Sequence, residues 1–260
     1  MEPLIQLKKH VPSGTIILNR PEKHNALSRA MTVQLKQAFE DFHLERKVRA
    51  VILTGAGSSF CSGADLAEIH ETSQSDDAQV QWHHDVVQYK ELIETMLRFP
   101  KPIIAAVNGP AVAGGAGLVL ASDLVVASSD AQFGLPEPRR GLVAGMVSPL
   151  LAFRVGGGLA ARLLLLADLV SAAEAHRYHL FHELVAADQV WARAHEMAAQ
   201  CAKSAPESLQ LAKKTINETI SEHLPMMLTA GAAASATART TEAAAEGVAA
   251  FLEKREPNWP

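Results

Sequence analysis

The feature that most constrains the fold is an uninterrupted apolar segment at residues 102–107 (PIIAAV). A strand that alternates apolar and polar residues exposes one face, whereas a continuously apolar strand is buried on both, as in a parallel sheet covered by helices. The segment is followed by Asn108 and Gly109 and then by a glycine-containing apolar stretch at residues 113–121. This order of strand, turn and helix predicts an α/β core.

Strands and helices are expected to alternate over most of the chain. Apolar side chains recur at helical spacing through Met31, Leu35 and Phe39, and Ser28 is a suitable N-cap for that helix. Residues 70–80 are largely polar, which predicts a mobile loop. The expected strands are residues 15–18, 49–54, 102–107, 124–127 and 131–135, and the expected helices are residues 28–46, 80–98 and 113–121.

From residue 148 onward the sequence is typical of helices almost without interruption. We therefore place an α/β core that carries the functional site at residues 1–198. A C-terminal helical region follows at residues 199–260. No internal repeat of fixed period is evident along the chain.

Charge and cysteine content narrow the classes of function. The 260-residue chain has 24 Lys and Arg against 28 Asp and Glu, so no basic excess marks a nucleic-acid surface. Two cysteines, Cys61 and Cys201, are too few for a disulfide framework and favour a reducing compartment. The first ten residues lack the apolar core of a signal peptide, and Gly, Ser or Asp interrupts the longest apolar runs. We expect a cytoplasmic protein with no nucleic-acid or membrane partner.

Two glycine-containing corners carry a chemical signal. One is residues 60–65 (FCSGAD), after a strand and a glycine turn, and the other is residues 108–115 (NGPAVAGG), which opens a helix. Glycine at such corners lets backbone N–H groups point into a shared space, and a helix N-terminus adds positive potential there. Two converging N–H donors would form an oxyanion hole. The alternative is that these glycines only permit tight turns and close packing.

A single carboxylate, Glu137, stands between Pro136 and Pro138. The two prolines fix the backbone on either side, which is the rigid mount that a positioned general base requires. The alternative is an exposed loop glutamate, the commoner fate of a Glu-Pro pair. Without a family comparison the residues favour that alternative.

Other motifs give weaker signals. Residues 55–60 (GAGSSF) have Phe where a dinucleotide-binding loop needs its third glycine, so a Rossmann site is not expected. The histidines within residues 83–85 and 176–182 have no recognised metal-ligand spacing, so we interpret them as surface or packing residues and expect no metal site. Cys61 has no identifiable partner base and is interpreted as a small buried residue.

Six segments spread over nearly the whole chain are specific in their order and spacing, although each is modest alone. They are LNRP with NAL at residues 18–27, VILTG at 51–55, FCSGADL at 60–66, KPIIAAVNG at 101–109, QFGLPE at 132–137 and EGVAAFLEKR at 246–255. Together they resemble the enoyl-CoA hydratase/isomerase (crotonase) superfamily. The resemblance implies a spiral of ββα units with a C-terminal helical region that builds homotrimers, often paired into hexamers. It also implies an acyl-CoA thioester substrate and no separate cofactor, since coenzyme A is part of the substrate.

The resemblance assigns roles to particular residues. It implies that the N–H groups of Ala64 and Gly114 form the oxyanion hole and that Glu137 is the catalytic acid/base. Phe251 and Lys254 match positions that reach the coenzyme A of a neighbouring subunit. The acyl pocket is expected to draw on residues 66–90, including Trp82, Val86 and Tyr89. The residues expected to contact substrate or coenzyme A are Lys23, His24, Ala26, Ser62, Ala64, Asp65, Leu66, Val112, Gly114, Pro136, Phe251 and Lys254.

The chain departs from the family pattern at its acid/base pair. Hydratases that use two carboxylates place the first one at the position of Gly117, so only the second, Glu137, is present. One carboxylate still moves a proton between carbons, which predicts double-bond isomerisation or hydration/dehydration through an enolate. The alternative is a catalytically silent acyl-CoA-binding protein of the same fold. A smaller departure is His179, which stands where the family often has a helix-ending glycine.

Overall fold

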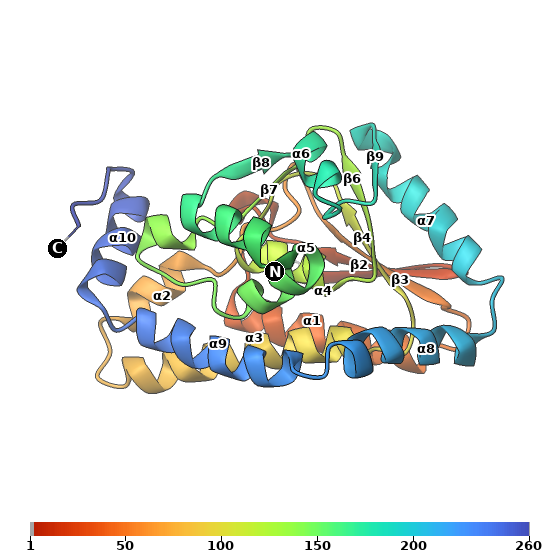
Figure 1. The fold of residues 1–260 in the computed structure, drawn as a ribbon, viewed down its shortest axis with the longest axis horizontal. Coiled ribbons are helices and arrows are strands. Elements are labelled where there is room, and N and C mark those ends of the chain that lie inside the picture. The colour runs from red at the N-terminus through yellow and green to blue at the C-terminus, as the bar shows by residue number, and fades with distance from the viewer. Residues whose placement is uncertain (1–2, 260) are drawn as a thin grey trace.

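The computed structural model describes residues 3–259 and has a six-stranded sheet at its centre (Figure 1). The strand order is β1-β2-β3-β4-β6-β9, in which β1 and β2 pair antiparallel and every other neighbouring pair is parallel. This sheet and the helices around it confirm the predicted α/β class. The strands are β1 (Ile5–His10), β2 (Ser13–Leu18), β3 (Ala50–Gly55), β4 (Ile103–Val107), β6 (Leu124–Ser128) and β9 (Glu183–Val185).

Helices cover both faces of the central strands, as the apolar sequence of β4 predicts. Ile104 belongs to a small core beneath α7 (Val190–Cys201), whereas its neighbour Ile103 faces the main core. That main core includes side chains of α1 (Arg29–Leu44) and α3 (Ala78–Arg98). The alternation follows from the two-residue period of a strand, because successive side chains point to opposite faces.

A second sheet, of order β5-β7-β8, supplies the segments that lead into the candidate site. Strands β5 and β7 are parallel neighbours, so their carboxyl ends lie at the same edge. The chain continues from β5 into helix α4 and from β7 into a short 3₁₀ turn at Glu137–Arg140. The elements are β5 (Ala111–Val112), α4 (Gly114–Ala121), β7 (Gln132–Gly134) and β8 (Leu169–Ser171).

Helix α5 (Val147–Leu166) follows the 3₁₀ turn and packs against α4. Within the described residues it is the one helix whose length and apolar composition would suffice to cross a membrane. Its apolar sequence contains the charged residue Arg154, and the helix is kinked at Gly156, where φ is 77°. Leu150 and Leu151, in its first half, are buried in the main core.

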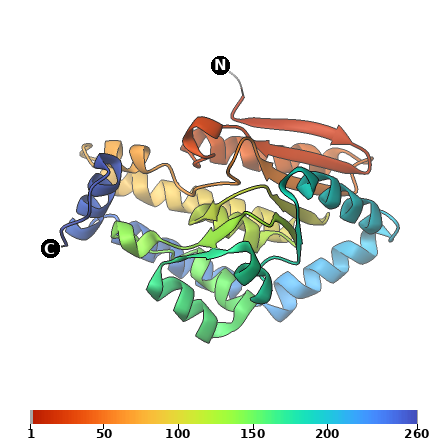
Figure 2. The same ribbon diagram turned by 90° about the horizontal axis from the view of Figure 1, so that it is seen from above.

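Helices α8 and α9 run along the lower edge of the molecule in Figure 1, and α10 stands at the end where the C-terminus lies (Figures 1 and 2). Helix α9 packs along α3, and α10 packs on α2 and on the 3₁₀ turn that begins at Glu137. The division at residue 198 and the assembly into trimers or hexamers stay predictions; α7 spans that division and packs on the sheet. The bounds are α6 (Ala172–Arg177), α8 (Pro206–Lys214), a π-helical turn (Thr215–Ile220), α9 (Leu224–Ala238) and α10 (Glu242–Glu253).

One expectation about the elements is wrong, a second needs a small correction, and one strand was not anticipated. Residues 70–80 do not form one loop, because α2 (Leu66–Thr72) includes their start and α3 begins at Ala78. Helix α2 is too short for a periodic signal, and Asp65 caps it by accepting a hydrogen bond from the N–H of Ala67. The chain after residue 148 is not wholly helical, since β8 and β9 are three-residue strands. Strand β1 was not anticipated, because only Ile5 in it is buried.

Candidate functional site

The two glycine-containing corners meet in space. Val112 donates a backbone hydrogen bond to the carbonyl of Cys61 at 2.9 Å, which joins them. Gly63 has φ +88°, a conformation that disfavours other residues. A Cβ atom there would lie 2.7 Å from Cβ of Ala113 and 2.9 Å from the backbone nitrogen of Gly114. The glycine therefore permits the close approach of one corner to the other.

The backbone N–H groups of Ala64 and Gly114 are unoccupied at this junction. The N–H of Leu27 donates to the carbonyl of Gly63, and the N–H of Asp65 donates to the carbonyl of Leu27. These two hydrogen bonds flank Ala64 and do not use its N–H group. Gly114 is the first residue of α4 and has no preceding turn to bond to. Neither N–H donates a hydrogen bond to a residue within 3–259. Ala64 and Gly114 line one and the same cavity.

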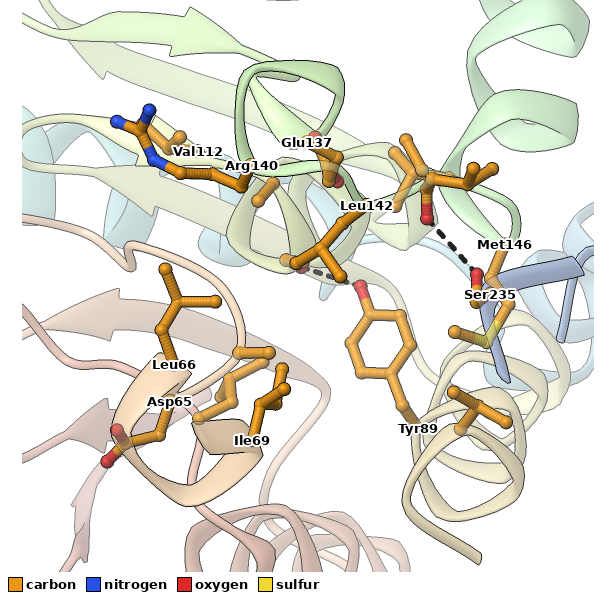
Figure 3. Close-up of a pocket in the computed structure, with 18 of the residues that line it drawn as sticks. Asp65, Leu66, Ile69, Tyr89, Val112, Glu137, Arg140, Leu142, Met146 and Ser235 are labelled. Atoms are coloured by element: carbon orange, nitrogen blue, oxygen red, sulfur yellow. Dashed lines mark hydrogen bonds between the residues drawn. The ribbon is translucent and has the colours of Figure 1, made fainter. Parts of the chain in front are cut away.

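Glu137 lines that cavity at the start of the 3₁₀ turn (Figure 3). Its Oε2 atom is buried and finds no hydrogen-bond partner in the described part of the chain. Burial raises the pKa of this carboxyl from 4.5 to about 7, against a smaller opposing effect of its own backbone N–H. The exposed-loop alternative for Glu137 is therefore wrong, because the surrounding segments enclose the carboxyl group.

Tyr89 fills the space beside Gly117. Its hydroxyl donates a hydrogen bond of 2.6 Å to the carbonyl of Gly114 (Figure 3). A Cβ atom on Gly117 would lie 2.1 Å from that hydroxyl oxygen, so a larger residue collides unless the tyrosine moves. Burial raises the pKa of Tyr89 well above 10, and nearby Cys61 and Glu137 add to this shift. The phenol therefore stays neutral beside residue 117, the position at which the resemblance implies an acid in two-carboxylate hydratases.

The cavity has a volume of about 460 Å³ and a largely apolar wall. Of the acyl-pocket residues predicted from residues 66–90, Val86 and Tyr89 line it, but Trp82 does not. Trp82 is instead buried one helical turn before Val86. The predicted contact residues in the wall are Ser62, Ala64, Asp65, Leu66, Val112, Gly114, Pro136 and Phe251, together with the predicted acid/base Glu137.

The other predicted contact residues lie outside the cavity wall. Lys23 and His24 are exposed on the 3₁₀ turn Pro21–Lys23 and its cap, and Ala26 follows them. They remain close to the site, because the N–H of Ser62 donates to the carbonyl of His24 at 3.1 Å. Lys254 is exposed at the end of α10. Contacts of these residues with coenzyme A stay predictions.

Asp65 has a structural use in this arrangement. One carboxylate oxygen caps α2, and the other pairs with Arg20 at 2.9 Å. The carboxylate points away from Glu137 and Tyr89 (Figure 3). Its backbone position, one residue after Ala64, therefore brings it near the site, while its side chain is engaged elsewhere.

The charged side chains in the cavity wall include three arginines that were not predicted, Arg29, Arg140 and Arg239, and Asp85, which lies within the predicted range 66–90 but was not singled out. The Arg140 guanidinium lies 4.5 Å from the ring centroid of Phe251, which connects the 3₁₀ turn to α10. The pair of arginines directly after Glu137-Pro138 is a signal in the sequence that could have drawn attention to Arg140. Nothing local marks Arg239, which follows a stretch of Ala and Thr.

His176, His182 and Cys61 take part in packing and hydrogen bonding inside the fold, as the sequence predicts. His182 accepts a hydrogen bond from the N–H of Val125 at 2.9 Å, and His176 bonds to the carbonyl of Phe181 at 2.8 Å. Among residues 3–259 no group of three or more His, Cys, Asp or Glu side chains lies close enough to hold a metal ion. Cys61 is fully buried, and burial raises its pKa to about 12, so it is a thiol at neutral pH.

Comparison with known proteins identifies the family. Residues 13–260 match the family described as enoyl-CoA hydratase/isomerase. The chain belongs to that family. A relative from Thermus thermophilus is 39% identical over 98% of this chain and 100% of its own length. The 1,2-epoxyphenylacetyl-CoA isomerase of Escherichia coli is 32% identical over 96% of each chain.

A solved member of the family has the same fold. The crystal structure of an enoyl-CoA hydratase/isomerase from Mycobacterium paratuberculosis superposes with a TM-score of 0.87 at 26% identity. The match covers 96% of this chain and 98% of that one. The crotonase-type fold expected from the sequence is thus confirmed. The family's description includes more than one reaction, so membership leaves the reaction of this chain to its own residues.

Proposed function

We propose that the chain binds an acyl-CoA thioester and moves a proton on its acyl group, with Glu137 as the single acid/base. The observation that carries the proposal is that the Glu137 Oε2 atom and the N–H groups of Ala64 and Gly114, none of which has a hydrogen-bond partner among residues 3–259, share one cavity. A carbonyl oxygen bound by both N–H groups would gain negative charge as a proton leaves the neighbouring carbon. Removing one donor from such a pair typically raises the activation free energy by about 3–4 kcal/mol.

The start of α4 adds to this stabilisation. Gly114 is the first residue of the helix, where the aligned peptide dipoles place positive potential. An enolate oxygen held there would be stabilised without a metal ion. The thioester carbonyl is itself the electron sink, so the proposed reaction uses no cofactor beyond the coenzyme A of the substrate.

The pKa of Glu137 suits both halves of a proton transfer. At about 7 it lies near neutral pH, so the carboxylate is a strong enough base to accept a proton and the acid gives it back readily. A carboxyl of ordinary pKa would be a weaker base by more than two units. The apolar cavity that buries Glu137 therefore provides the basicity that the proposed step needs.

Double-bond isomerisation is the reaction that the site supports best. Two-carboxylate hydration needs a second acid at residue 117, and the neutral hydroxyl of Tyr89 fills the space beside that glycine. One carboxylate is sufficient to remove a proton from one carbon and return it to another. Hydration by the single glutamate is the competing outcome, and the same assays distinguish the two.

We place coenzyme A at the mouth of the cavity. Ser62, Leu66 and Phe251 are predicted contact residues in the wall, and Arg140 adds a positive charge suited to a phosphate. Lys23, His24, Ala26 and Lys254 are proposed to contact the part of the molecule that extends outside. The cytoplasmic location and the trimeric or hexameric assembly are further predictions from the sequence.

The test compares wild type with Glu137→Gln on panels of 2-enoyl- and 3-enoyl-CoA thioesters in D₂O. We expect wild type to interconvert the two classes and to exchange protons at the α-carbon. The substitution should lower both rates by about 10²–10⁴-fold, the usual size of a lost general base. Binding of hexanoyl-CoA, measured by calorimetry, is the control for an intact site.

Two results would contradict the proposal. Undiminished exchange in Glu137→Gln would remove Glu137 from the mechanism. Binding of acyl-CoA by wild type without turnover or exchange would instead establish the silent acyl-CoA-binding protein. Addition of water to a 2-enoyl-CoA that depends on Glu137 would retain the site and replace isomerisation by hydration.

A further inference from the structure

A cluster of charged side chains lies in the wall of the same cavity, apart from Glu137. Asp85 on α3 receives two hydrogen bonds from Arg29, from Nε at 2.7 Å and from Nη2 at 3.0 Å. Arg239, at the end of α9, donates from Nη1 to the same carboxylate at 3.4 Å. Two arginines therefore share one aspartate. Two further acids lie near Arg29: Glu68, which accepts a hydrogen bond from its backbone N–H, and Glu71.

The acceptor capacity of Asp85 is already used. Its Oδ1 accepts from Arg29 and from Gln81, and its Oδ2 accepts from both arginines. Four hydrogen bonds saturate a carboxylate, which has about four lone-pair sites. The Asp85–Arg239 pair can therefore still donate hydrogen bonds, through Arg239, but cannot accept more. Such a pair favours a ligand group that accepts hydrogen bonds.

Arg239 holds most of that capacity. A guanidinium has five N–H donors, and within the described chain Arg239 uses only the long bond to Asp85. The Arg239 side chain is 11% exposed and lines the cavity. Burial lowers the pKa of Arg239 to about 10, so the group still carries its charge at neutral pH. A buried cation with a shared counter-ion is costly unless a further acceptor reaches it.

The cluster stands a short way from the proposed reaction centre. Asp85 and Tyr89 are four residues apart on α3, so they lie on one face and about 6 Å apart along the helix axis. The Tyr89 hydroxyl contacts the carbonyl of Gly114. An acyl group whose thioester oxygen sits at Gly114 would reach Arg239 with a short chain across apolar wall residues such as Ile69 and Val86.

We propose that Arg239 binds the far end of the acyl group and that the preferred substrates are acyl-CoA thioesters whose chain ends in a carboxylate. This inference rests on the proposed acyl-CoA function. A carboxylate accepts two parallel hydrogen bonds from a guanidinium, which is the geometry that arginine favours. It would also supply Arg239 with the second anionic partner that the structure does not give it.

The test uses two saturated thioesters of equal chain length, adipyl-CoA and hexanoyl-CoA, which differ in the terminal carboxylate. Calorimetry measures their binding to the full chain as wild type, Arg239→Met and Arg239→Lys, with Arg162→Met on the exposed face of α5 as the matched control. We expect wild type and the control each to bind adipyl-CoA at least about tenfold more tightly than hexanoyl-CoA. Arg239→Met should lose this preference while hexanoyl-CoA affinity stays within about twofold. Arg239→Lys should retain part of it, since the charge remains.

Each other outcome bears on the inference. Equal binding of the two thioesters by wild type would overturn it and leave the proposed function intact. An equal loss of both affinities in Arg239→Met, with wild-type preference absent, would show that Arg239 only ties α9 to α3 or contacts coenzyme A. Failure of wild type to bind either thioester would overturn the proposed function along with the inference.

Discussion

At the scale of single residues, the site depends on what surrounds Glu137. The carboxyl belongs to a rigid Pro-Glu-Pro segment, and its Oε2 lies in an apolar cavity without a partner among the residues described. Desolvation penalises the charged form and so raises the pKa. Among residues 3–259 no cation offsets the effect of this burial on the pKa of Glu137. Asp85 differs, because its hydrogen bonds to Arg29 and Gln81 lower its pKa although it is partly buried.

The first prediction is a pH dependence that follows from this contrast. Proton abstraction needs the carboxylate form of Glu137, so kcat/KM should be low in acid, rise with pH, and level off above a midpoint at about 7. Rate measurements from about pH 5 to about pH 9 on a 3-enoyl-CoA would give the profile. Glu137→Asp should retain the rising shape with a lower plateau, because a carboxylate is kept. A midpoint near 4.5 would mean that the carboxyl is solvated in the working enzyme.

At the scale of elements, the proposed choice of reaction depends on the contact between α3 and α4. Gly117 on α4 and Tyr89 on α3 fit only as a pair, because any Cβ on the glycine would meet the phenol oxygen at 2.1 Å. Compared with the two-carboxylate pattern that the resemblance implies, the proposed site has a neutral hydroxyl on α3 in place of an acid on α4. Glycine at residue 117 therefore avoids a collision with the observed position of the Tyr89 side chain.

The second prediction uses glycine-to-alanine changes in two helices. Gly117→Ala should lower the free energy of unfolding by about 1–3 kcal/mol through overpacking, and it should shift the Tyr89 hydroxyl. Gly158→Ala on α5 is the control, since a Cβ there meets nothing within 4 Å and the helix should gain about 1 kcal/mol. Urea denaturation of both variants and of Gly117→Ala/Tyr89→Ala gives the comparison. A neutral Gly117→Ala would show that the phenol moves freely.

The sequence was sufficient for elements whose signal is local. The apolar run of β4 indicated a strand buried on both faces, and Ser28 was identified as the cap of α1, where it accepts from the N–H of Met31 at 3.2 Å. Strands β8 and β9 were missed because three residues are too few to reveal a period. His179 has φ +60°, so the left-handed conformation expected where the family has glycine is present without the glycine.

The partners within the site could not be read in the same way. Tyr89 was expected in the pocket, but its position beside Gly117 depends on how α3 packs against α4, which no local pattern encodes. Arg239 is more than a hundred residues from Asp85 in sequence and reaches it only because α9 lies along α3. The proposed backbone donors and Glu137 were found from the resemblance, since a glycine corner or a Glu-Pro pair alone favours ordinary roles.

At the scale of the whole molecule, the C-terminal helix α10 packs over the segments that form the proposed site. Helix α10 packs on α2 and on the 3₁₀ turn that carries Glu137, as Figure 2 shows at the end of the molecule where the C-terminus lies. Gly141 and Gly247 make this packing close, because a Cβ at either would meet backbone of the opposite segment at less than 2.5 Å. Phe251 thus lines the cavity of its own chain, whereas the resemblance implies that it reaches the coenzyme A of a neighbouring subunit; that reach stays a prediction.

The third prediction follows from that closure. A chain ending at residue 241 would lack α10 and with it the contact between Phe251 and Arg140, but it would keep the main core, whose buried residues all precede residue 233. We expect circular dichroism to show a folded protein that melts cooperatively, with KM for acyl-CoA raised about tenfold or more because one wall of the mouth is missing. Phe251→Ala in the full chain should reproduce part of the rise in KM with kcat little changed. If the shortened chain kept the wild-type KM, substrate would enter the cavity without touching α10, and the coenzyme A position proposed for Phe251 would be wrong.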